Sequence, residues 1–114
     1  MEFEDVSVLI TPKSKRIHTV WLSRKFSSGS LAREELKKIK AVLEKHYKRQ
    51  GKQERFSVDP NYKFEFNNAT ITLRANILFS SAEIEIIATD KKLDTLAEKE
   101  AKSIAIEKTD TSVL

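Results

Sequence analysis

The chain has 114 residues, of which 39% are hydrophobic and 33% are charged, and it contains no cysteine. This length fits one domain with a core of its own, and this composition is typical of a folded globular chain. The lack of cysteine excludes a disulfide framework and thiolate-bound zinc. The apolar stretches are far shorter than the roughly 20 residues that span a bilayer, so the sequence predicts no contact with a membrane.

Positive charge is concentrated in the first half of the chain. Residues 1–57 hold 14 Lys/Arg against 7 Asp/Glu, a net charge of +7, whereas residues 58–114 hold 7 Lys/Arg against 10 Asp/Glu, a net charge of −3. The first five residues include three acids and no apolar run, which is unlike a signal peptide. We therefore expect a cytoplasmic location, or a nuclear one in a eukaryote.

The first fifty residues predict a hairpin followed by a helix. Residues 6–11 and 16–22 are rich in β-branched side chains, and the short turn between them favours antiparallel pairing. Ser30 is a good helix N-cap and Gly51 a plausible stop, so we expect a helix over about residues 30–50. Its apolar face repeats at spacings of three and four, at Ala32, Leu36, Ile39, Leu43 and Tyr47.

The second half predicts three strands and a last helix. Residues 62–66 are separated by Asn67-Asn68 from residues 69–79, in which apolar and polar side chains alternate. Ser80-Ser81 then precedes a second alternating stretch over residues 82–88. Asp90 is positioned to cap a helix. The sequence thus predicts one α+β domain over residues 1–108 and a flexible C-terminal tail over 109–114.

The predicted element order is ββαβββα. Alternating strands and amphipathic helices favour a two-layer α+β fold with a mainly antiparallel sheet and two helices packed on one face. Whether the N-terminal hairpin joins the main sheet or forms a separate ribbon stays open.

Catalysis has little support in the sequence. His18 and His46 are the only near-neutral bases, without a serine nucleophile elbow, and the two glycines are isolated. Glu83 and Glu85 lie on one face of a predicted strand, but a cross-strand ion pair with Arg74 is favoured over a metal site. We therefore expect no enzyme activity, no catalytic residues, no metal site and no cofactor.

The basic residues are the best functional signal, because dense positive charge attracts phosphates and releases counterions. His18, Trp21, Phe26 and Tyr47 are aromatic neighbours that could stack on bases. We predict a non-enzymatic nucleic-acid-binding module for RNA or DNA that makes mostly phosphate contacts. The predicted nucleic-acid-binding residues are Lys13, Lys15, Arg16, Arg24, Lys25, Lys37, Lys38, Lys45, Lys48, Arg49, Lys52 and Arg55.

The order helix–three strands–helix over residues 30–108 is also that of double-stranded-RNA-binding domains, which contact shape and phosphates. The glycine and lysine cluster that precedes the last helix of those domains is missing here, and only Lys91-Lys92 remains. The likeness is therefore one of element order alone.

A second hypothesis is a protein–protein adaptor or inhibitor. It would act through an edge strand or through the basic patch on an acidic protein partner. The same edge strand could pair with a second copy of the chain to form a homodimer.

Overall fold

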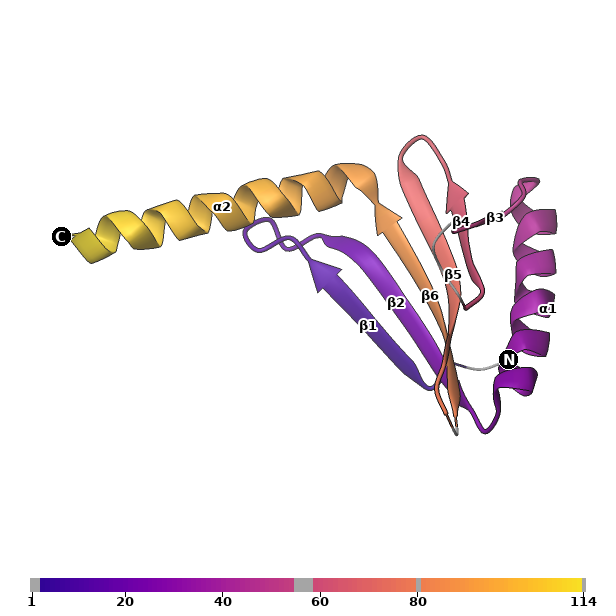
Figure 1. Cartoon of the computed structure of the whole chain (residues 1–114). Coiled ribbons are helices and arrows are strands. Elements are labelled where there is room, and N and C mark those ends of the chain that lie inside the picture. Colours follow the sequence, from indigo (N-terminus) through magenta and orange to yellow (C-terminus); the bar gives the residue numbers. More distant parts are fainter. Residues whose placement is uncertain (1–2, 55–58, 80, 114) are drawn as a thin grey trace.

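The computed structural model describes residues 3–54, 59–79 and 81–113. Eight elements follow one another in the order ββαββββα, which is the predicted order with one short extra strand after the first helix (Figure 1). Their bounds are β1 Asp5–Ile10, β2 Ile17–Phe26, α1 Gly29–Tyr47, β3 Lys52–Gln53, β4 Asn61–Glu65, β5 Ala69–Ile77, β6 Ala82–Asp90 and α2 Lys91–Val113.

All six strands belong to one antiparallel sheet with the order β1-β2-β6-β5-β4-β3. The N-terminal hairpin joins the main sheet because β2 pairs with β6 from Thr19↔Thr89 to Phe26↔Ala82. This settles the question that the sequence left open. The α+β class, the antiparallel sheet and the two helices are as predicted from the sequence.

The core lies between α1 and the middle of the sheet. Its buried members are Ala32 and Leu36 from α1, together with Leu73, Ala75, Ala82 and Ile84 from β5 and β6. They meet because alternate residues of each strand point to the same face, and spacings of four place α1 residues on one stripe. Burial of this apolar surface is what fixes α1 on the sheet.

Both ends of α1 differ from the predicted ones. The N-cap is Ser28 rather than Ser30, and its side chain accepts a hydrogen bond from Leu31 N at 3.3 Å. The helix ends at Lys48, which takes a left-handed conformation with φ 53°. Gly51 has another role, because a Cβ there would lie 2.8 Å from Cζ of Phe64.

The two helices take different positions on the sheet. α1 covers β5 and β6, as expected for a helix packed on one face. α2 starts where β6 ends, contacts β2 and β6, and then projects beyond the sheet past the β1–β2 turn (Figure 1). Asp90 caps it as predicted, since its Oδ1 accepts a hydrogen bond from Leu93 N at 2.9 Å. Among the described residues, no helix is both long and apolar enough to cross a membrane.

Candidate nucleic-acid interface

The predicted basic residues do not form one surface. Lys13, Lys15 and Arg16 lie in the β1–β2 turn beside α2, whereas the basic residues of α1 lie on the opposite side of the molecule (Figure 1). Arg24 and Lys25 lie near the end of β2. Lys37, Lys38 and Lys45 lie on α1, Lys48 and Arg49 directly follow it, and Lys52 starts β3. Arg55 lies outside the described residues.

The residues of the β1–β2 turn are partly engaged within the chain. Nζ of Lys13 lies 2.9 Å from Glu107 Oε1 and donates a hydrogen bond to Ser103 Oγ, also at 2.9 Å. The backbone N–H groups of Lys13 and Ser14 both donate to Glu100 Oε1, at 2.7 Å and 2.9 Å. This group of contacts, which we call the turn–α2 clip, attaches α2 to the sheet and leaves Lys13 less able to bind an external anion.

The basic residues on α1 and β2 differ in how many contacts they make. Lys38 lies 3.4 Å from Glu35, and the Arg24 guanidinium lies 5.3 Å from the centre of the Phe26 ring. Lys37 and Lys45 are exposed, and no carboxylate of the described residues lies within 4.0 Å of either. An exposed lysine of this kind is ordinarily solvated, so these two positions do not by themselves define a site.

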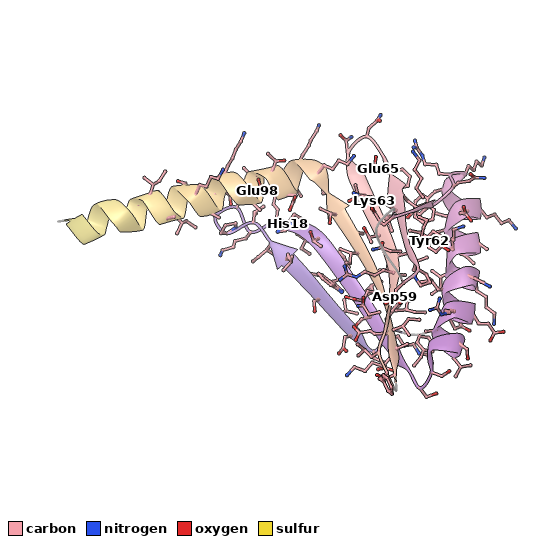
Figure 2. All side chains as sticks on the ribbon, in the orientation of Figure 1. His18, Asp59, Tyr62, Lys63, Glu65 and Glu98 are labelled. Carbon is pink, nitrogen blue, oxygen red and sulfur yellow. The ribbon has the colours of Figure 1, made fainter. Side chains whose placement is uncertain are left out.

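Four cations surround one open hollow of about 710 Å³ next to the C-terminal end of α1. We call it the basic hollow; its cations are Arg49, Lys52, Lys63 and Lys91, and Glu65 is the one acid in its lining. Figure 2 shows Lys63 and Glu65 near the end of β4. These cations come from four parts of the chain, because the left-handed Lys48 turns the chain from α1 into β3, and α2 begins beside the β4–β5 turn.

Two of the four cations are held in place by backbone oxygens. Arg49 Nη1 donates to the carbonyl oxygen of Glu65 at 2.9 Å, and its guanidinium lies 5.0 Å from the centre of the Phe66 ring. Lys91 Nζ donates to the carbonyl oxygen of Phe66 at 2.8 Å. Each cation keeps further N–H donors, since lysine has three and arginine five. The hollow therefore presents oriented positive charges.

Lys52 and Lys63 face each other across the β3–β4 pairing. Like charges directly opposite one another on antiparallel strands are destabilising. Lys63 has partial compensation from Glu65 at 3.8 Å, whereas no carboxylate of the described residues lies within 4.0 Å of Lys52. A bound anion between the two lysines would relieve this repulsion.

An apolar pocket of about 400 Å³ lies on the other side of Phe66, which contributes to the lining of both hollows. Its wall also includes Tyr47, whose ring centre is 5.1 Å from that of Phe66 with the planes inclined at 62°. Ile71 and Val20 are among the other apolar residues that line the pocket. The two rings thus form an aromatic ridge, Tyr47 and Phe66, beside a charged hollow and an apolar one.

Glu85 on the opposite face of the sheet is occupied by contacts within the chain. Trp21 Nε1 donates to its Oε2 at 2.5 Å, Arg74 Nε donates to its Oε1 at 3.1 Å, and Asn76 also donates to it. The predicted ion pair between Arg74 and Glu85 is confirmed. Glu83 instead lies opposite Lys25 and Asn76 in the sheet.

The two histidines make ordinary structural contacts. His18 Nδ1 lies 3.5 Å from Asp94 Oδ1 and 2.9 Å from Thr19 Oγ1, so it joins the start of β2 to α2 (Figure 2). The His46 ring packs edge-on against Tyr47, with ring centres 4.7 Å apart. Thr19 and Asp94 both approach the same ring nitrogen of His18, whereas a catalytic triad places the nucleophile and the carboxylate on different ring nitrogens.

The basic hollow contains two residues of the predicted set and two that were not predicted. Arg49 and Lys52 were predicted, but Lys63 and Lys91 lie in the half of the chain with net negative charge. The observed register of the β5–β6 pair places Asp90 opposite Ala69, which local sequence patterns did not predict. Lys91 therefore lies beside the Asn67-Asn68 turn, at the end of the strand that carries Lys63.

Comparisons of the chain with family models, with curated proteins and with solved structures find no match.

Proposed function

We propose that the chain is a non-enzymatic nucleic-acid-binding module that takes single-stranded RNA or DNA across the basic hollow and the aromatic ridge. The observation that carries the proposal is the convergence of four cations on one open hollow, directly beside an apolar pocket. Backbone phosphates would occupy the hollow, and a base would enter the pocket against Tyr47.

The chemistry of a single strand matches both hollows. Its phosphates are anionic, and its unpaired bases are flat and largely apolar, so proteins that bind it combine a positive groove with aromatic platforms. A duplex offers the same phosphates but keeps its bases stacked inside. Single strands should therefore bind more tightly than duplexes of equal length.

The first experiment is fluorescence anisotropy of the full chain with labelled single- and double-stranded RNA and DNA over a range of salt concentrations. Each phosphate neutralised on a single strand contributes about −0.7 to the slope of log K against log salt, so four cations predict a slope of roughly −3. Absence of binding to any of these probes even at low salt contradicts the proposal. In that case, an acidic protein partner becomes the favoured alternative.

The most direct test of the basic hollow is a double variant that carries both Lys52→Gln and Lys63→Gln. Removing both charges should weaken single-strand binding and make the salt slope shallower by about 1.4. The fold should be as stable as before or slightly more so, because the repulsion between the two lysines is removed. Thermal unfolding followed by circular dichroism gives the stability.

A matched control is Lys99→Gln with Lys102→Gln. These two lysines are exposed on α2, away from the hollow, and their loss changes the net charge by the same amount. Binding by the control should stay close to that of the unchanged chain. Equal loss in both variants would mean that only the overall charge matters and that the basic hollow is not the site.

A further inference from the structure

The strand β1 forms an open edge of the sheet. It pairs with β2 on one side only, and all six of its residues are exposed. An edge strand presents a row of backbone N–H and C=O groups without partners in the sheet, which can pair with another strand. Val6, Val8 and Ile10 alternate along β1, with 65%, 47% and 45% of their surface exposed. One face of the open edge is therefore apolar.

The opposite edge of the sheet differs from β1 in both length and charge. β3 has two residues and begins with Lys52, and short or lysine-bearing edge strands are poor templates for pairing. β1 has six residues and no proline, and no charged residue interrupts it between Val6 and Ile10. β1 is accordingly the edge suited to strand addition.

The charges at the two ends of β1 indicate which strand it accepts. Glu4 and Asp5 lie at its N-terminal end, and Lys15 and Arg16 lie in the turn beyond its C-terminal end, where Lys13 is already paired with Glu107. An antiparallel copy of β1 would place the acidic end of each chain beside the basic turn of the other. A parallel copy would bring like charges together.

We infer that β1 pairs with β1 of a second copy of the chain, antiparallel and centred on Val8, to give a two-fold symmetric dimer with one continuous sheet. In this register Val8 faces Val8 of the second copy and Val6 faces Ile10. Apolar side chains then meet along one face, and Asp5 and Glu4 of each chain lie opposite Thr11 and Pro12, at the start of the other chain's basic turn. The inference stands apart from nucleic-acid binding and is tested without any nucleic acid.

The position of α2 agrees with this arrangement. α2 runs past the β1–β2 turn on the side where the sheet ends (Figure 1), and Glu107 contacts that turn through Lys13 at 2.9 Å. The radius of gyration is 17.5 Å, whereas a compact chain of this length has one of about 13 Å. A second sheet continuing from β1 would extend alongside this projecting part of α2, where Ile106 is 62% exposed.

The experiment exploits the absence of cysteine from the chain. Val8→Cys places one thiol on the two-fold axis, so a short bismaleimide should join two chains efficiently. Val6→Cys is the control, because it lies on the same face and is also exposed. In the proposed register the two copies of residue 6 are offset by four residues, or roughly 14 Å at about 3.4 Å per residue. A cross-linker shorter than this should leave Val6→Cys mostly unlinked.

Sedimentation velocity completes the test. The unchanged chain should form a species of twice the 13.1 kDa of one chain as its concentration rises. Val8→Lys should remain monomeric with an unaltered circular dichroism spectrum, because two lysines would meet on the axis. A chain that stays monomeric at every concentration overturns the inference. Equal cross-linking of Val6→Cys and Val8→Cys overturns the register and with it the proposed dimer.

Discussion

Glu85 shows how a single buried charge can be accommodated in the middle of a sheet. Only 5% of its surface is exposed, and it accepts hydrogen bonds from Trp21, Arg74 and Asn76. A buried carboxylate costs free energy unless it is paired and hydrogen-bonded. The three donors come from β2 and β5, so Glu85 on β6 links three adjacent strands.

Removing the charged partner of Glu85 should therefore destabilise the fold. We expect Arg74→Met to lower the free energy of unfolding by roughly 3 kcal/mol, because it leaves a buried carboxylate without its counter-charge. Urea denaturation measures the change. Lys63→Met, a change at an ion pair nearer the surface, should cost less than about 1 kcal/mol. Equal effects of the two substitutions would show that the burial of Glu85 has no special energetic consequence.

Tyr47 tests the aromatic ridge at the scale of one residue. It is 38% exposed and borders the apolar pocket, so a base could stack against it. Loss of one stacking platform costs about 1–3 kcal/mol, so Tyr47→Ala should weaken single-strand binding by roughly 5- to 150-fold. Phe79→Ala, at the β5–β6 turn, is the matched control because Phe79 is fully exposed and distant from the pocket in the sheet. Similar anisotropy titrations for both variants would contradict a role for Tyr47.

At the scale of elements, α2 depends on the turn–α2 clip. The carboxylate of Glu100 accepts hydrogen bonds from the backbone N–H groups of Ser14 and Lys13 and from Ser14 Oγ. These bonds, with that from Ser14 N contributing most, hold the pKa of Glu100 below its usual value. They favour the ionised carboxylate, so protonation weakens the attachment of α2 to the β1–β2 turn.

The lowered pKa of Glu100 determines how the attachment of α2 depends on pH. A carboxyl group with a lowered pKa in the folded state stabilises the fold above its unfolded pKa, and this contribution is lost as the pH falls through the folded value. Acidification below the usual range for glutamate should therefore loosen α2 first. NMR titration should show the amide signals of Lys13 and Ser14 shifting together with the Glu100 carboxyl. In Glu100→Gln this coupled shift should disappear; its persistence would assign it to another group.

Element boundaries show what local sequence patterns can and cannot predict. The hairpin, the meander, the Asp90 cap and the amphipathic stripe of α1 were all predicted, because each depends on residues close together in the sequence. The start of α1 was placed at Ser30 instead of Ser28, because both serines suit an N-cap by residue type and only the structure shows that Ser28 accepts the hydrogen bond from Leu31 N. β3, with only two residues, gives no periodic signal.

At the scale of the whole molecule, the sheet determines which charges meet. Lys13 and Lys52 both belong to the predicted basic set. Lys13 follows β1 and Lys52 lies in β3, and these two strands are the opposite edges of the sheet. Lys63 and Lys91 come from the acidic half and still join the basic hollow. Charge along the sequence drew attention to Arg49 and Lys52, but only strand order shows that Lys63 and Lys91 lie beside them.

The shortness of β3 also limits how far the sheet can grow. If β1 pairs with β1 of another copy, the two outer strands of the joined sheet are the two copies of β3, each with two residues and beginning with Lys52. Such segments offer too few backbone groups to template a further strand. Strand-mediated association of this chain should thus stop at a closed pair and not propagate into fibres. The protein would gain a partner surface without acquiring a tendency to polymerise.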